Sequence, residues 1–340
     1  MLYGLCPTLI LSFYHFIIYS FNHSRIAVFK TLPLPTMDNN KKSYLFALAA
    51  VLFWSTIASA LKISLRYIDF GQLLLYACIT TIIILFLTLA GQKKSDLIKK
   101  LKPKDYLRAA VLGLINPFAY YIVLLKAYDL LLAQEAGTLN YVWPVVLVLF
   151  SIPLLKQKIG WISIVAIFIS FFGTIVIGTQ GNIFDLKFSS PLGVGLALVS
   201  AVFWALYWIY NVKDKKDEIV KLFLNFVFGT CYVLIFLMAT SRITIPNIYG
   251  LIGSVYVGIF ELGLTYILWM KGLQLAKTTA KVSNLVFISP FISLFFIRFI
   301  VGEDILFSTI AGLTLIIGGI LLQQYAGKLE KGCKPRGTRG

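Results

Sequence analysis

The sequence contains few of the residues on which catalysis and metal binding usually depend. Its 340 residues include two histidines, His15 and His23, both near the start of the chain. Everything beyond them must work without the commonest general base and metal ligand. The four cysteines are far apart and form no Cys-x-x-Cys pair, so the sequence indicates neither a disulfide framework nor a zinc site. We therefore expect no cofactor and no bound metal.

Charged residues are scarce as well. They make up 13% of the chain, whereas apolar residues make up 59%. A soluble domain of this length would expose far more charge, so most of the surface must face lipid. The net charge of +17 resembles that of a nucleic-acid-binding protein, but the lysines and arginines lie in short segments between apolar runs, as they do in membrane loops. The composition predicts an integral membrane protein whose partner is the lipid bilayer and not a nucleic acid.

Ten apolar runs are long enough to cross a bilayer as helices, which takes roughly 20 residues each. The predicted transmembrane helices cover residues 44–61, 70–90, 107–125, 136–155, 159–178, 191–210, 220–240, 247–270, 280–301 and 305–325. Their connections are short, so we expect sequence neighbours to pack antiparallel, with no sizeable soluble domain. The predicted fold class is an all-α integral membrane protein with ten transmembrane helices.

Residues 1–36 form an N-terminal extension ahead of these helices. Residues 1–21 are apolar enough to span a membrane, but no positively charged segment precedes them and no clear cleavage site follows. Pro33 and Pro35 then prevent a helix from continuing. Met37 opens a polar lead-in to the first predicted helix. The extension is therefore either an upstream mis-start, with Met37 as the natural start, or an additional helix.

The distribution of lysine and arginine predicts the orientation in the membrane. Alternate loops place 23 of them on one side, including the basic segment 93–108, the loop 213–221 and the tail 327–340. The other side holds six, which are Lys62, Arg66, Lys126, Lys187, Arg242 and Arg298. Loops rich in positive charge remain in the cytoplasm. We therefore expect a multi-pass protein of the cell membrane with both termini in the cytoplasm.

The two halves of the sequence resemble each other. The matching positions are Phe53-Trp54 with Phe203-Trp204, Tyr121 with Tyr266, and Pro144 with Pro290. They occur in the same order and at nearly constant separation, which predicts two repeats, residues 41–178 and 191–326. Each repeat holds five spans, an odd number, so the two must insert with opposite polarity. Such inverted repeats enclose a binding site near the middle of the membrane. The alternative is chance similarity among apolar helices.

These features together resemble the drug/metabolite transporter superfamily, EamA type, over residues 41–326. The run from Pro290 to Gly302-Glu303 is similar to that family's signature between helices nine and ten, whereas the first half has Gln157 where the acid would be. The segment Glu135–Pro144 resembles the fourth helix of the aromatic amino acid exporters. The resemblance implies a secondary transporter, and this local likeness favours an amino acid as the cargo.

Glu261 is the acid predicted to lie near the middle of the membrane, in the eighth span. A carboxyl group at that depth is costly unless it faces a cavity or a partner, which makes it a functional candidate. It could carry a proton or pair with a substrate amine. The structural alternative is a protonated acid that bonds to a neighbouring helix.

The other candidates are aromatic and amide side chains in the spans. The substrate-binding candidates are Trp54, Asn116, Tyr121, Asn140, Tyr141, Trp143, Trp204, Tyr207, Trp208, Tyr266 and Asn284, and helix kinks are predicted at Pro144 and Pro290. Trp54 and Trp204, as equivalents in the repeat, are expected to line the cavity from opposite sides. The alternative is that these side chains only pack helices together or face lipid.

The residues favour a carrier over other classes of membrane protein. An enzyme would need a nucleophile with a base, or a metal cluster, at membrane depth, and the spans contain no histidine and no Gly-x-Ser-x-Gly motif. A primary pump would need a phosphate-binding loop, which the sequence lacks. We therefore expect a secondary transporter or exporter of a small molecule, most simply an aromatic or apolar amino acid, working as a monomer or homodimer. The alternative cargo is a drug-like cation, a nucleotide sugar or another metabolite.

Overall fold

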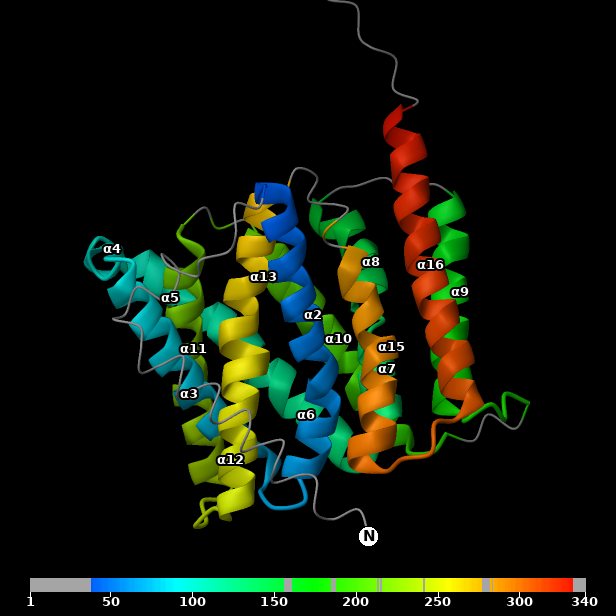
Figure 1. Cartoon of the computed structure of the whole chain (residues 1–340), viewed down its shortest axis with the longest axis horizontal. Coiled ribbons are helices and arrows are strands. Elements are labelled where there is room, and N and C mark those ends of the chain that lie inside the picture. Colours follow the sequence, from blue (N-terminus) through cyan, green and yellow to red (C-terminus); the bar gives the residue numbers. More distant parts are fainter. Residues whose placement is uncertain are drawn as a thin grey trace, which may run out of the picture.

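The computed structural model describes residues 38–155, 161–184, 188–212, 214, 216–240, 242–276, 282 and 284–332 (Figure 1). Every regular element in these residues is a helix, as the composition predicted. The N-terminal extension 1–36, Gln157 and the last eight residues of the basic tail lie outside the described residues. The helix α16 extends to Gly332, into the segment that the sequence assigned to that tail.

The helices follow the predicted spans closely. In the first half they are α2 (Asn39–Ser64), α3 (Phe70–Gly91), α4 (Asp96–Lys99), α5 (Pro103–Gly113), η1 (Leu114–Ala119), α6 (Tyr120–Leu130), α7 (Ala133–Asn140), α8 (Trp143–Leu155) and α9 (Trp161–Gly178). In the second half they are α10 (Pro191–Val212), α11 (Glu218–Ala239), α12 (Ile248–Val257), η2 (Gly258–Gly263), α13 (Leu264–Leu275), η3 (Asn284–Ile288), α15 (Ser289–Phe296), η4 (Ile297–Val301) and α16 (Phe307–Gly332).

Six helical stretches of the described chain are long and apolar enough to cross a membrane, and three shorter apolar helices accompany them. The fourth and ninth predicted spans are not continuous α-helices. Pro144 and Pro290 are each the second residue of an α-helix, α8 and α15, and each follows an interruption. Proline lacks the amide that would continue the hydrogen bonding of a preceding helix, so it is well accommodated in the first turn of a new one.

The two halves contain equivalent helices at nearly constant separation. α3 and α11 begin and end 148 positions apart, at Phe70 and Glu218 and at Gly91 and Ala239. The third helix of each half is interrupted by a π-helical segment, η1 in the first and η2 in the second. The interruption therefore recurs in the same helix of each half, at Leu114 and at Gly258.

Two pairs of equivalent helices, the second and the fifth of each half, lie side by side and antiparallel. α3 packs on α11, and the residues next to the start of each helix contact the segment that follows the other. α9 packs on α16, where Ser170 Oγ donates to the Ile316 carbonyl and Gly173 lies against Gly312. α3 and α11 lie on one side of the molecule and α9 and α16 on the other (Figure 1).

Two ends of this bundle are distinguished below. The basic end is where the segment between α3 and α5 meets the loop between α10 and α11, at the top of Figure 1. The opposite end is where the loop between α2 and α3 meets the loop between α11 and α12, at the bottom of Figure 1.

Candidate substrate site

Glu261 lies in η2, where the helix is irregular because Gly263 departs from helical geometry (φ −107°, ψ −89°). The Tyr121 hydroxyl, from α6 in the other half, donates a hydrogen bond of 2.8 Å to Glu261 Oε1. The acid thus has a partner from a neighbouring helix, which was one of the two environments that the sequence allowed. A hydrogen-bonded carboxyl group can be kept at membrane depth at much lower cost than an unpaired one.

Asn116 occupies the equivalent interruption, η1, in the first half. Its backbone is extended (φ −147°, ψ 120°) and its side chain is buried. Its amide oxygen has no hydrogen-bond partner within the described residues. An unpaired buried acceptor is costly in free energy unless water or a ligand satisfies it.

Trp204 is the centre of an aromatic cluster that draws on four helices, α6, α8, α10 and α13. The distances from its ring centroid are 4.7 Å to Tyr120, 6.5 Å to Trp143, 6.2 Å to Tyr207, 5.9 Å to Trp208 and 6.2 Å to Tyr266. We call these six residues the Trp204 cluster. Edge-to-face and tilted ring pairs at these distances are favourable. The cluster offers aromatic faces to an apolar or aromatic side chain, and to a cation.

Trp54 reaches the same cluster through Tyr266. Its ring centroid lies 6.1 Å from that of Tyr266 and 5.3 Å from that of Trp269. Tyr266 therefore contacts both members of the repeat-related pair Trp54 and Trp204. The second such pair, Tyr121 and Tyr266, is linked indirectly, since Tyr121 packs on Tyr120 at 4.6 Å.

Asn140, the last residue of α7, joins three helices at the edge of the cluster. Its amide oxygen accepts from the Tyr120 hydroxyl (3.2 Å), and its amide nitrogen donates to Ser200 Oγ (2.8 Å). Tyr141 follows at the break between α7 and α8. Asn284 begins η3, and its side chain lies outside the described part of the structure.

Two donors of the cluster are buried without a partner in the described chain. They are the Tyr266 hydroxyl and the Trp208 indole N–H. Both groups usually find a hydrogen-bond acceptor when they are buried. Together with Glu261, the site thus contains an acceptor for an ammonium group and two donors that could serve an anionic oxygen.

Sequence reasoning missed Tyr120, Ser200 and Trp269. Tyr121 matches Tyr266 of the second half, whereas its neighbour Tyr120 has no such match. The comparison of the halves therefore did not identify Tyr120, although its ring lies next to Trp204. Nothing local marks Ser200 or Trp269, because their partners are brought in by other helices.

Glu303 has a role that the sequence signature alone did not reveal. Its carboxylate accepts from the amides of Ala133 (2.8 Å) and Gln134 (3.3 Å), so it caps the start of α7 from the other half. Gly302 precedes it with a left-handed backbone (φ +82°), which favours glycine and turns the chain out of η4. An anion at a helix N-terminus satisfies free amides and interacts favourably with the helix dipole.

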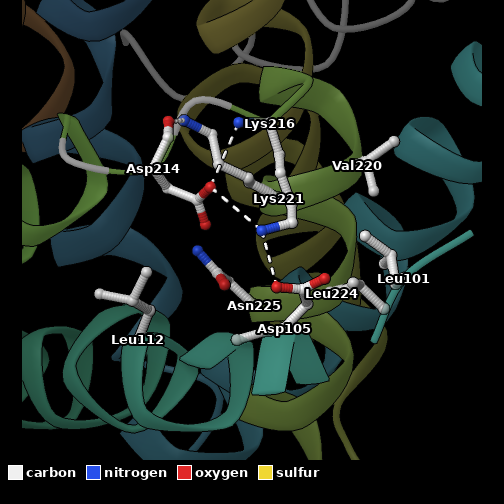
Figure 2. A pocket seen from close by; sticks show the side chains of 10 residues that line it. Leu101, Asp105, Leu112, Asp214, Lys216, Val220, Lys221, Leu224 and Asn225 are labelled. Atoms are coloured by element: carbon white, nitrogen blue, oxygen red, sulfur yellow. Dashed lines mark hydrogen bonds and ion pairs between the residues drawn. The ribbon is translucent and has the colours of Figure 1, made fainter. Parts of the chain in front are cut away.

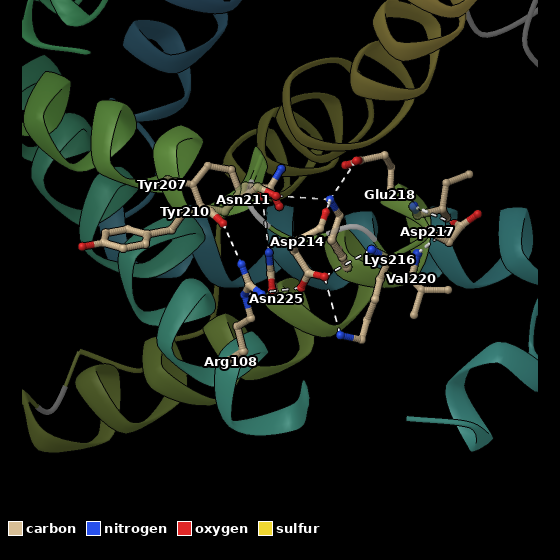
Figure 3. Close-up of polar contacts among 12 residues, drawn as sticks. Arg108, Tyr207, Tyr210, Asn211, Asp214, Lys216, Asp217, Glu218, Val220 and Asn225 are labelled. Carbon is tan, nitrogen blue, oxygen red and sulfur yellow. Dashed lines mark hydrogen bonds and ion pairs between the residues drawn. The ribbon is translucent and has the colours of Figure 1, made fainter. Parts of the chain in front are cut away.

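A separate polar cluster lies at the basic end. Lys216 Nζ lies 2.7 Å from Asp105 Oδ1 and 3.6 Å from Asp214 Oδ1, beside a cavity of about 10 Å³, enough for about one water molecule (Figure 2). Arg108 reaches Asp214 Oδ2 at 3.5 Å from Nε and donates to the Tyr210 carbonyl (Figure 3). The hydrogen bond with Asp105 raises the pKa of Lys216.

Lys221 completes this cluster from inside the protein. It is 4% exposed, and its ammonium group donates to the carbonyls of Asn211 (3.3 Å) and Asp214 (2.9 Å) and pairs with Glu218 (2.7 Å). A cation there satisfies carbonyls at the end of α10 that no helical amide can reach. Sequence reasoning treated these charges only as loop charges that set the orientation.

Comparisons with known proteins agree with this architecture. The model of the EamA-like transporter family matches residues 41–179 and 191–323. An uncharacterized transporter of Clostridium kluyveri is 29% identical over 303 residues, 85% of this chain and 94% of the relative. The aromatic amino acid exporter YddG of Escherichia coli is 24% identical over 294 residues, 83% of this chain and 96% of that protein. A protein of known crystal structure, with 20% sequence identity, superimposes with a TM-score of 0.61. The match covers 86% of this chain and 99% of the chain in the crystal structure, so the two proteins share a fold.

The helical fold and the two matched segments define a multi-pass membrane transporter. Within that class the chain belongs to the EamA-like transporter family, whose model covers well over half of it. The resemblance inferred from the sequence is thereby confirmed, as is the expectation that the protein is a transporter and not an enzyme.

Proposed function

We propose that this protein is a secondary transporter that exports an amino acid with an aromatic or apolar side chain. In this proposal residues 41–178 and 191–326 are two inverted repeats of five transmembrane helices each, and access alternates by movement of one against the other. The antiparallel packing of α3 on α11 and of α9 on α16 supports the inversion. The count of basic residues supports cytoplasmic termini, with the basic end facing the cytoplasm.

The single observation that carries the cargo proposal is the Tyr121–Glu261 hydrogen bond beside the Trp204 cluster. The Glu261 carboxylate would receive the ammonium group of the cargo, and the aromatic rings its side chain. The unpaired donors of Tyr266 and Trp208 would receive its carboxylate. The likeness to an aromatic amino acid exporter supports the same class of cargo.

Glu261 is also the proposed site of proton coupling. A carboxyl group that binds either a proton or the cargo's ammonium group, but not both, exchanges one for the other across the membrane. Glu261→Gln keeps the shape and the hydrogen bond to Tyr121 but cannot titrate. Transport by this variant is expected to be weaker, because the cargo's ammonium group loses its carboxylate partner, and to show no dependence on the pH gradient. An unchanged dependence would remove the proton role.

The test of the cargo uses three compounds that differ in one charged group each: L-phenylalanine, phenethylamine and 3-phenylpropionate. In proteoliposomes that contain the full chain, we expect counterflow of radiolabelled phenylalanine and none of phenylpropionate, which lacks the ammonium group. Tyr266→Phe removes one hydroxyl and is expected to lower phenylalanine transport several-fold while sparing phenethylamine. Failure of phenylalanine to move, with movement of a nucleotide sugar instead, would contradict the proposed cargo.

A drug-like cation is the second candidate cargo. Glu261 and the surrounding aromatic faces favour it, because a carboxylate and aromatic rings together bind organic cations. The same assay separates the two, since a cation carrier would move phenethylamine well and phenylalanine poorly, and Tyr266→Phe would then affect neither selectively.

A further inference from the structure

The second helix of each half is capped by one aspartate, and the two caps have the same geometry. Asp69 Oδ1 accepts from the Gly71 amide at 2.9 Å, at the start of α3. Asp217 Oδ1 accepts from the Ile219 amide at 3.0 Å, at the start of α11. These bonds satisfy amides that no helical carbonyl can reach. Each cap uses one carboxylate oxygen and leaves the other available.

The second oxygen of each aspartate binds a cation from the other half. Lys94 Nζ lies 2.6 Å from Asp217 Oδ2 at the basic end, and Arg242 Nη1 lies 3.0 Å from Asp69 Oδ2 at the opposite end. Each cation stands three residues beyond the end of its own helix. Both the aspartates and the cations are 148 positions apart in the sequence. We call these ion pairs the Lys94 clasp and the Arg242 clasp.

Between the two clasps, each helix also meets the interrupted third helix of the other half, at a glycine where the backbones are too close for a side chain. A Cβ at Gly113 would come 2.5 Å from the Asn225 carbonyl oxygen on α11, and a Cβ at Gly258 would come 2.5 Å from the Ala77 carbonyl oxygen on α3. Thr81 adds a hydrogen bond of 3.0 Å from its hydroxyl to the Gly258 carbonyl. α11 is therefore packed against α5 and α3 against η2, in addition to the packing of α3 on α11 and the ion pairs at both ends.

Both clasps are closed in the same structure. Paired gates of a carrier alternate, because access from both sides at once would be a leak. An occluded carrier could close two gates together, but opening at either clasp would also disturb a helix cap and separate two helices, α3 and α11, that pack on each other. We infer that α3 and α11 form a fixed spine that stays closed at both ends, and that the movement proposed above takes place around it. This inference rests on the proposed alternating access.

The test asks whether the two clasps can be closed in one molecule at the same time, without reference to any cargo. In a variant that lacks the four natural cysteines, cysteines replace Lys94, Asp217, Asp69 and Arg242. A bifunctional thiol reagent with the span of an ion pair then crosslinks each end, and intact mass counts the crosslinks. The mismatched pair Lys94→Cys with Arg242→Cys is the control, since those positions lie at opposite ends of the spine.

We expect the second crosslink to form at a rate within twofold of the first, and phenylalanine counterflow to persist in the doubly crosslinked protein. Suppression of the second crosslink by tenfold or more would show that the clasps alternate, and would overturn the inference. If the fourfold variant does not fold, spin labels in the two double variants replace it. One narrow distance at each end is expected, and two populations at either end would overturn the spine. Absence of phenylalanine transport before crosslinking would count against the proposed cargo only.

Discussion

The basic end and the opposite end of the spine share one geometry and differ in chemistry. At the basic end Lys216 binds Asp105 and Asp214 through charges. At the opposite end, Ile68 is equivalent to Lys216, which lies 148 positions later in the sequence. Gly250 is equivalent to Asp105, which lies 145 positions earlier. There Ile68 is buried, and a Cβ added at Gly250 would lie 2.7 Å from the Cβ of Ile68. The equivalent contacts between the two halves are thus polar at one end and apolar at the other.

The two halves therefore have the backbone arrangement in common, and not the chemistry of the paired side chains. A partly buried ion pair and an apolar contact can occupy equivalent places, since either satisfies the groups that it buries. The clasps keep their charges at both ends because each aspartate also caps a helix, a role that an apolar residue cannot fill.

The largest expected effect separates the two ends directly. Ile68→Ala is expected to lower the free energy of unfolding by about 2–4 kcal/mol, because it empties a buried position. Lys216→Ala should cost less than about 1 kcal/mol, because the pair that it breaks is partly exposed. Thermal unfolding in detergent measures both. Raising the salt to 1 M should shrink only the effect of Lys216→Ala; equal salt dependence at the two positions would contradict the comparison.

A second prediction concerns the backbone contacts that the two ends share. Gly113→Ala and Gly258→Ala are each expected to cost about 1–3 kcal/mol, because the added methyl group meets a carbonyl oxygen. Gly195→Ala is the matched control, since no atom of the described residues lies within 4 Å of a Cβ there. It should be neutral or stabilise by about 0.5–1 kcal/mol. Similar melting temperatures for all three variants would show that the spine is looser than described.

The smallest expected effect is the pH dependence of the basic end. Partial burial alone would raise the pKa of Asp217, but the hydrogen bond and charge of Lys94, with two backbone amides, hold that pKa below its ordinary value. A lowered pKa gives stability that is present above the ordinary aspartate value of about 3.9 and is lost as the pH falls through the folded value. The raised pKa of Lys216 gives stability that is present below about 10.4 and is lost as the pH rises through the folded value.

The ion pairs of Asp217 and Lys216 are therefore expected to contribute the same free energy of unfolding from about pH 5 to pH 9. The difference in melting temperature between the wild type and Lys94→Met should be constant over this range and should shrink below about pH 4. A difference that changes near neutral pH would mean that another titrating group, and not Asp217, controls this end.

Much of the fold could be predicted from hydropathy, because a bilayer imposes a helix length on the sequence. The break before Pro144 was predicted as a kink, whereas the structure has two separate helices, α7 and α8. Proline explains why no continuous helix forms, but the position of the break at Tyr141 and Val142 depends on tertiary packing.

The candidate site was predictable in part. Glu261 stood out because an acid is rare at membrane depth, and Trp54 and Trp204 because the repeat relates them. The clasps could not be predicted in the same way. The sequence analysis singled out neither Asp69 nor Asp217, and nothing local indicates that Arg242 and Lys94 reach them from the other half. The repeat fixes which positions are equivalent, but not which of them meet in space.

The opposite insertion of the two halves can be measured directly at two equivalent loops. In a chain without natural cysteines, Lys99→Cys labels the loop between the second and third spans, and Ile245→Cys labels the loop between the seventh and eighth. Both side chains are largely exposed, at 80% and 96%. If the halves are inverted, a membrane-impermeant maleimide should label Ile245→Cys in intact cells and Lys99→Cys only after permeabilisation. Labelling of both from the same side would contradict the inverted arrangement and the transport mechanism that depends on it.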